Sequence, residues 1–192
     1  MDVVGIVLAA GAGRRMGGPK ALVGGWADPR TPLAEVAARL HEGGCPRVLT
    51  VIGAEADAVR VAVGDPPAWL RLVEATDWSE GLGASLRAGL RAAGDAPVAL
   101  VSLVDLPDVR ADVVARLLAT VPLVERTLAR AAYGGVAGHP ALIGRAWWPR
   151  VSEVALGESG ARDLFAAEEH LLVECGDLAT GRDRDSDLPE RA

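Results

Sequence analysis

A glycine-rich, basic segment near the N-terminus holds the first residues whose types and spacing could do chemistry. It reads LAAGAGRRMGGPKAL and directly follows a continuously apolar run. Such a run, ending in glycines, is typical of a buried strand followed by a loop, and ligands of open α/β sheets bind beyond the carboxyl ends of strands. Backbone amides of this loop could wrap phosphate oxygens, while Arg14, Arg15 and Lys20 would add positive charge.

The glycine spacing distinguishes between known phosphate-binding loops. A dinucleotide fingerprint requires G-x-G-x-x-G, but after Gly11 and Gly13 the third glycine, Gly17, comes one position late. A Walker loop requires a hydroxyl residue after its lysine, and here Ala21 follows Lys20. The three basic residues suit a triphosphate better than a dinucleotide, and a solvated basic turn is the remaining alternative.

A carboxylate stands at the end of a second apolar run. PVALVSL is followed within two residues by Asp105. Mg²⁺ prefers one or two carboxylates together with phosphate oxygens and waters, so a single aspartate at a strand end is sufficient protein chemistry for it. A capping role for Asp105 is the simpler alternative.

Elements that would position these residues follow from short apolar runs that alternate with helical patterns. We expect strands at 3–10, 47–52, 70–74, 97–103, 128–133, 140–143 and 171–175, and helices at 32–40, 54–63, 84–93, 110–119 and 160–168. This alternation predicts a three-layer α/β sandwich with a Rossmann-like, mostly parallel sheet.

Bulk properties limit the classes of function. The 192 residues favour a single domain over residues 1–180 with a charged tail over 181–192. A net charge of −6 argues against nucleic acid or an anionic membrane as a partner. Cys45 and Cys175 lack metal-ligand spacing, so we expect reduced thiols. The apolar start is too short to span a bilayer and has no basic flank, which favours a cytoplasmic location.

The opening loop resembles the signature LAxGxxxRMGxxK of the MobA-like nucleotidyltransferases, which include enzymes that attach CMP or GMP to molybdopterin. The resemblance implies the fold of the nucleotide-diphospho-sugar transferases. It implies that Arg15 and Lys20 are catalytic residues that bind the triphosphate. It also implies nucleotide binding by the following residues: Leu8, Ala9, Ala10, Gly11, Ala12, Gly13 and Arg14.

Later segments resemble the cytidylyltransferase branch of that family. DWSEGLGASLRAGL is similar to W-x-x-G-x-x-x-S-L-x-x-G-L, which implies nucleotide binding by Gly83 and Ser85 and acceptor binding by Arg87. A helix N-terminus at this point would favour anions. Asp105 begins a segment similar to the D-x-P motif, whose aspartate binds Mg²⁺.

Two more segments extend the resemblance over about residues 4–173. YGGVAGHPALIG is similar to G-x-x-G-H-P-x-L-x-G, which implies that Gly138 and His139 bind the acceptor, and LGESGARDLF is similar to G-x-x-G-A-R-x-L. Ala75 stands where the family often has asparagine. The family's D-x-D-T-P-x-D appears only as RDRDSDLPER, where Asp183 and Asp185 are either further metal ligands or part of a solvated tail.

The resemblance implies a Mg²⁺-dependent transfer of a nucleoside monophosphate to a phosphorylated acceptor. CTP and a molybdopterin-type acceptor are favoured, and GTP with a molybdopterin or another phosphorylated acceptor is the nearest alternative. A non-catalytic nucleotide-binding module, working with a molybdoenzyme or its chaperone, is a second. A nicotinamide-dependent oxidoreductase is disfavoured by the glycine spacing and the basic cluster.

Overall fold

A seven-stranded sheet forms the centre of the molecule. The computed structural model describes residues 3–13, 18–19, 21–22 and 31–183, and its strand order is β3-β2-β1-β4-β6-β5-β7. The strands are β1 (Val3–Leu8), β2 (Arg47–Ile52), β3 (Leu70–Glu74), β4 (Val98–Leu103), β5 (Leu128–Tyr133), β6 (Val136–Gly144) and β7 (Leu171–Glu174). Only β6 runs against its neighbours, so the predicted mostly parallel sheet is confirmed.

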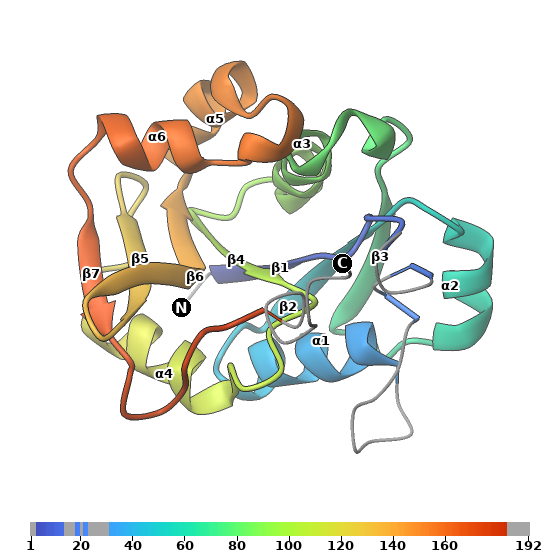
Figure 1. Ribbon diagram of the computed structural model, residues 1–192, viewed down its shortest axis with the longest axis horizontal. Helices are drawn as coiled ribbons and strands as arrows, with labels where there is room; N and C mark the ends of the chain where they lie inside the picture. The colour runs from blue at the N-terminus through green and yellow to red at the C-terminus, as the bar shows by residue number, and fades with distance from the viewer. Residues whose placement is uncertain (1–2, 14–17, 20, 23–30, 184–192) are drawn as a thin grey trace, which may run out of the picture.

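Helices cover both faces of this sheet (Figure 1). On one face lie α1 (Pro32–Glu42) and α4 (Ala111–Thr120), and on the other lie α3 (Leu82–Ala93), α5 (Trp148–Val154) and α6 (Arg162–Ala167). The helix α2 (Ala56–Val63) lies beside β3 at one end. Each face has its own apolar cluster, which confirms the three-layer prediction. Within the described ranges, no helix is long and apolar enough to cross a bilayer.

Small residues let the layers approach closely, and only seven residues of the sequence are Trp, Tyr or Phe. Every residue of β1 is buried. A Cβ added to Gly89 of α3 would lie 2.8 Å from Cγ2 of Ile6, so this helix rests directly on β1. At the start of α1, the Thr31 hydroxyl accepts a hydrogen bond from the Ala34 amide at 3.2 Å, and Pro32 follows in the first turn. Both are the helix-start signals that the sequence provides.

The C-terminal half differs from the sequence prediction in two elements. β6 begins at Val136, four residues before the expected start, because Gly134 and Gly135 form the whole turn with φ values of +59° and +80°. The Gly-His-Pro segment therefore belongs to a strand and not to a loop. The helix α5 was not predicted, although Pro149 occupies its first turn, a usual helix-start position.

Two hydroxyl side chains are buried in the sheet with their oxygens lacking a hydrogen-bond partner among the described residues. Thr50 of β2 and Ser102 of β4 both pair with Val7 of β1, and they are 0% and 1% exposed. Such a group pays its desolvation cost without compensation. The buried hydroxyl groups of Thr50 and Ser102 therefore lower the free energy of unfolding.

The change Thr50→Val is expected to raise the free energy of unfolding by about 1 kcal/mol, because it keeps the shape and removes the unsatisfied hydroxyl. Urea denaturation would measure it. Thr127→Val is the matched control with the opposite expectation, since the Thr127 hydroxyl donates to Pro122 O and accepts from the Val124 amide. A Thr50→Val protein less stable than the wild type would contradict the prediction.

Candidate nucleotide and metal site

A cavity of about 690 Å³ opens at the carboxyl ends of β1 and β4. Leu8 pairs with Leu103 in the sheet, so the loops that follow the two strands leave it at the same level. The start of α3 and the end of the described chain complete the walls. The cavity is lined by Leu8, Ala9, Ala10, Gly11, Ala12, Gly13, Trp78, Ser79, Gly81, Leu82, Ser85, Leu103, Val104, Asp105, Glu158 and Asp183.

The loop after β1 is held by its first residues and then opens toward the cavity. The Ala9 amide donates to Val51 O at 2.9 Å, and Ala10 O accepts from the Ala54 amide at 3.0 Å. Gly11 is exposed, and a Cβ added there would meet nothing within 4 Å. All six residues predicted in this loop, 8–13, line the cavity. The predicted Arg14, Arg15 and Lys20 lie outside the described residues.

Two carboxylates from opposite ends of the chain line the same cavity. Asp105 follows β4 and is 9% exposed, and Asp183 comes from the C-terminal segment. The Val104 amide donates to Leu8 O at 3.3 Å, which ties the Asp105 loop to the end of β1. The described part of the chain has no cluster of three or more His, Cys, Asp or Glu arranged for a metal, but Mg²⁺ requires only one or two carboxylates. The predicted Asp185 lies outside the described residues.

The wall opposite the β1 loop comes from the entry to α3. Ser85 is 4% exposed and lines the cavity, as predicted for a nucleotide contact. Trp78 and Ser79, in the 3-10 turn η1 (Trp78–Glu80), also line it, and Trp78 packs so closely on Gly53 that a Cβ there would lie 2.5 Å away. Trp78 and Glu158 were not predicted as site residues, although both stand within segments that resemble family motifs.

Gly83 and Arg87 lie behind this wall and do not line the cavity. A Cβ added to Gly83 would lie 2.2 Å from Ala155 O. Arg87 donates to the same carbonyl at 2.5 Å and to the Glu80 carboxylate at 2.9 Å. Both residues thus join α3 to the segment after α5, and their predicted contacts with nucleotide and acceptor stay predictions.

The predicted acceptor residues Gly138 and His139 lie in β6, beside the end of β4. Gly138 packs against the Tyr133 ring, where a Cβ would lie 2.8 Å from a ring carbon. Tyr133 donates its hydroxyl hydrogen to His139 O at 2.6 Å, and the His139 Nδ1 lies 3.4 Å from Val101 O. The peptide bond before Pro140 is cis. Neither predicted residue is among those that line the cavity.

Burial, together with the nearby positive charge of Arg130, lowers the pKa of His139 to about 4. The unfolded chain has an ordinary histidine pKa near 6.5 and takes up this proton first. The contribution of neutral His139 to the free energy of unfolding is therefore fully present above about pH 6.5 and is lost as the pH falls toward 4. Within the folded protein the imidazole stays neutral at physiological pH.

We expect the wild type to lose thermal stability between pH 6.5 and pH 4 more steeply than His139→Gln, which has no proton to take up at this position. Melting temperatures of both proteins across pH 4–8 measure the difference. The His139 ring signal, followed by NMR in the same range, is an independent check. An imidazole that titrates near pH 6.5 in the folded protein would contradict the prediction.

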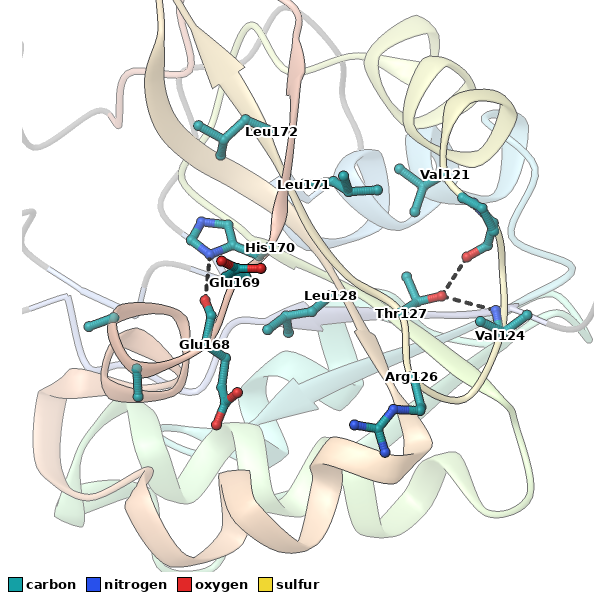
Figure 2. Close-up of a pocket in the computed structure, with 13 residues that line it drawn as sticks. Val121, Val124, Arg126, Thr127, Leu128, Glu168, Glu169, His170, Leu171 and Leu172 are labelled. Atoms are coloured by element: carbon teal, nitrogen blue, oxygen red, sulfur yellow. Dashed lines mark hydrogen bonds between the residues drawn. The ribbon is translucent and has the colours of Figure 1, made fainter.

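A larger cavity of about 830 Å³ lies elsewhere, between residues 121–128 and 166–172 (Figure 2). It is at the start of β5 and β7, which is the opposite edge of the sheet from the β1 and β4 loops. Its polar groups serve local contacts: Thr127 bonds to the neighbouring backbone, and His170 Nδ1 lies 3.1 Å from Glu168 O. It contains none of the predicted site residues, so the smaller cavity is the candidate site.

The arrangement of the smaller cavity is typical of α/β proteins that bind nucleotides or other phosphorylated ligands. A glycine-rich loop, a helix entry and two carboxylates meet at the carboxyl edge of a mostly parallel sheet. That edge is where α/β proteins bind nucleotides and other phosphorylated ligands.

Residues 5–172 match the model of the MobA-like NTP transferase domain, and the chain belongs to this nucleotidyltransferase family. The chain is 38% identical over 194 residues to nicotine blue oxidoreductase of Paenarthrobacter nicotinovorans, covering 96% of this chain and 92% of that protein. The resemblance inferred from the sequence motifs is therefore confirmed at the level of the family, whereas the cytidylyltransferase branch is not.

Solved structures support the fold. A homologue of Mycobacterium tuberculosis Rv0371c from Mycobacterium sp. strain JC1 has a TM-score of 0.75 at 26% identity, covering 97% of this chain and 92% of the other. A nucleotidyl transferase from Methanothermobacter thermautotroptrophicus has a TM-score of 0.72 at 22% identity, covering 90% and 87%. The predicted fold type is thus confirmed.

Proposed function

We propose that the chain transfers a nucleoside monophosphate from CTP to a small phosphorylated acceptor of the molybdopterin type, with release of pyrophosphate. One observation carries this proposal. In a chain of the NTP transferase family, the amide-bearing loop after β1 and the carboxylate of Asp105 after β4 line the same cavity. Amides suit phosphate oxygens and a carboxylate suits the cation that accompanies them.

In the proposed reaction an acceptor phosphate oxygen attacks the α-phosphorus of the nucleotide. A new phosphorus–oxygen bond forms to the acceptor, and the bond between the α-phosphorus and the bridging oxygen to the β-phosphorus breaks. Pyrophosphate carries away that bond's electron pair. The protein's contribution is positioning and neutralisation of charge, so no side chain needs to form a covalent bond.

The chain's own residues divide this work. The backbone of the loop 8–13 is assigned to the base and phosphates, and Arg15, Lys20 and Arg14 are assigned to the triphosphate. Asp105 and Asp183 supply hard oxygen ligands, and Asp185 is a further candidate ligand. The two described carboxylates fit a Mg²⁺ site because they line one cavity from separate loops. Bound there, Mg²⁺ would neutralise phosphate charge in the transition state.

Ser85 is assigned to the nucleotide, and Gly138 and His139 are assigned to the acceptor. Ser85 lines the cavity and can donate its hydroxyl hydrogen to a phosphate oxygen. A neutral His139 whose Nδ1–H faces Val101 O leaves Nε2 as a hydrogen-bond acceptor without adding charge. Arg87 supports this side through its bonds to the segment after α5.

The base preference for CTP rests on the resemblance of the helix-entry and Gly-His-Pro segments. At the position where the family often has asparagine, Ala75 is 1% exposed and its amide donates to Ile52 O at 2.9 Å. No side-chain amide is therefore available at residue 75 to read a base. For this reason GTP is included in the test as the nearest alternative.

Thermal shift with each of the four nucleoside triphosphates, with and without Mg²⁺ or Mn²⁺, tests binding and base choice together. A ligand at one hundred times its Kd stabilises the folded state by about 2.7 kcal/mol, so the shift is readily measured. We expect the largest metal-dependent shift with CTP, and pyrophosphate release when molybdopterin is added. The absence of metal-dependent stabilisation by every triphosphate would refute the proposal. Stabilisation without pyrophosphate release would favour a non-catalytic binding module.

A second candidate function is that of an oxidoreductase. It is favoured by the 38% identity to nicotine blue oxidoreductase over 96% of this chain. The late third glycine of the loop argues against a standard dinucleotide fingerprint. Stabilisation by NADH or NADPH and a change in nicotine blue absorbance would favour this candidate, and the same thermal-shift plate can include both cofactors.

A further inference from the structure

We propose that Asp108 is a positioning residue that tethers the C-terminal segment, residues 175–183, and thereby places Asp183 beside Asp105 in the cavity. This inference rests on the proposed function, because it concerns the second carboxylate of the same metal site. Asp108 is the fourth residue of the Asp-Leu-Pro-Asp segment, and the sequence motifs predict no role for it.

The tether is a pair of short hydrogen bonds. The Asp108 Oδ2 accepts one from the Thr180 amide and one from the Thr180 hydroxyl, both at 2.6 Å. Asp105 lies three residues before Asp108, and Asp183 lies three residues after Thr180. Three residues of extended chain span at most about 10 Å. Asp105 therefore lies within about 10 Å of Asp108 along the chain, and Asp183 lies within about 10 Å of Thr180. A contact between residues 72 positions apart therefore limits how far the two carboxylates can separate.

A second contact directs the segment after the tether. Gly181 has a φ of +68°, and a Cβ added there would lie 2.2 Å from the Tyr133 ring. The chain can pass this close to the ring only as glycine. The Arg182 amide donates to the Thr180 hydroxyl oxygen at 3.3 Å, which continues the turn toward Asp183.

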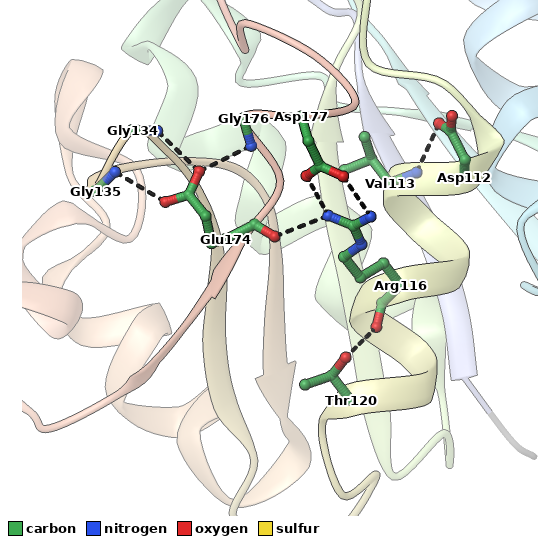
Figure 3. Close-up of polar contacts among 9 residues, drawn as sticks. All are labelled: Asp112, Val113, Arg116, Thr120, Gly134, Gly135, Glu174, Gly176 and Asp177. Carbon is green, nitrogen blue, oxygen red and sulfur yellow. Dashed lines mark hydrogen bonds and ion pairs between the residues drawn. The ribbon is translucent and has the colours of Figure 1, made fainter.

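Contacts further up the segment hold its start (Figure 3). Arg116 of α4 donates to both carboxylate oxygens of Asp177, at 2.5 and 2.8 Å. The Glu174 carboxylate accepts hydrogen bonds from the amides of Gly134, Gly135 and Gly176. Asp177 is six residues before Asp183, a length that can span about 20 Å when extended. The bonds of Asp108 to Thr180 lie three residues from Asp183 and therefore limit the position of the last part of the segment more closely than the bond at Asp177 does.

Asp108→Ala tests the proposal in the full-length protein. We expect the Mn²⁺ affinity of the protein–CTP complex, measured by EPR, and the Mg²⁺ affinity from turnover to fall at least about tenfold, as for other residues that orient metal ligands. KM for the acceptor should stay unchanged. Asp108→Asn, which keeps one acceptor oxygen, should restore most of the affinity. Asp112→Ala is the matched control, because its carboxylate bonds only to the adjacent Val113 amide among the described contacts.

A double-mutant cycle separates positioning from a general effect on the fold. If Asp108 acts through Asp183, Asp108→Ala should cause no further loss of Mn²⁺ affinity in an Asp183→Asn protein. An equal loss in both backgrounds would overturn the inference, and so would wild-type Mn²⁺ affinity in Asp108→Ala. If Asp108→Ala does not fold, Thr180→Val replaces it in the cycle, with a smaller loss expected from removing one of the two bonds. Failure of the wild type to bind CTP with metal would instead refute the proposed function.

Discussion

Replacing Asp105 with asparagine is expected to reduce turnover by about 10²–10³-fold, since a metal's stabilisation of transition-state charge is worth several kcal/mol. Asparagine keeps the size of the side chain and removes the negative charge that holds the cation. Asp105 is 9% exposed and lines the cavity. Water can therefore replace its carboxylate as a ligand of the cation only in part. Pyrophosphate release at varied Mg²⁺ concentration measures the loss, and we expect added Mg²⁺ to restore activity only partly.

The other end of the same strand provides the control. Asp95 precedes β4 as Asp105 follows it, its side chain is 99% exposed, and it lies 3.4 Å from Arg145 in a surface ion pair. Asp95→Asn removes an equal charge at the opposite edge of the sheet and should leave turnover unchanged. Full turnover by Asp105→Asn would refute the assignment of this residue as a metal ligand.

The change Gly83→Ala is expected to lower the free energy of unfolding by about 1–3 kcal/mol through overpacking. A methyl group at this position would lie 2.2 Å from the oxygen and 2.6 Å from the carbonyl carbon of Ala155. Backbone atoms cannot rotate away as a flexible side chain would, so α3 and the segment after α5 must separate. At other positions in a helix, a change from Gly to Ala usually raises the free energy of unfolding by up to about 1 kcal/mol. A decrease at residue 83 would therefore indicate overpacking against Ala155.

Urea denaturation of Gly83→Ala and of Gly11→Ala measures this effect. A Cβ at Gly11 meets nothing within 4 Å, so we expect that variant to keep wild-type stability. The nucleotide-binding role predicted for Gly83 is tested in the same proteins by thermal shift with CTP. Wild-type stability combined with weakened CTP binding in Gly83→Ala would favour direct nucleotide contact over packing.

Local sequence patterns predicted most elements because they reflect local physics. Continuous apolar runs marked the buried central strands, and Thr31 with Pro32 marked the start of α1. The patterns were wrong where packing against a neighbouring strand decides the conformation. β6 extends through Gly138, where Tyr133 on the neighbouring strand packs against it. The glycine-rich turn is therefore shorter than predicted and consists of Gly134 and Gly135.

The family, the layered fold and the core of the candidate site could be predicted from the amino-acid sequence, since loop 8–13 and Asp105 directly follow strands whose carboxyl ends meet at one edge. Ser85 was predicted as well, but which further residues line the cavity depends on the tertiary fold. It brought Asp183 and Trp78 to the cavity and placed Arg87 behind its wall. The physical reason is that spacing along the chain specifies neighbours a few residues apart. Contacts such as that of Asp108 with Thr180 instead depend on how whole strands and helices pack.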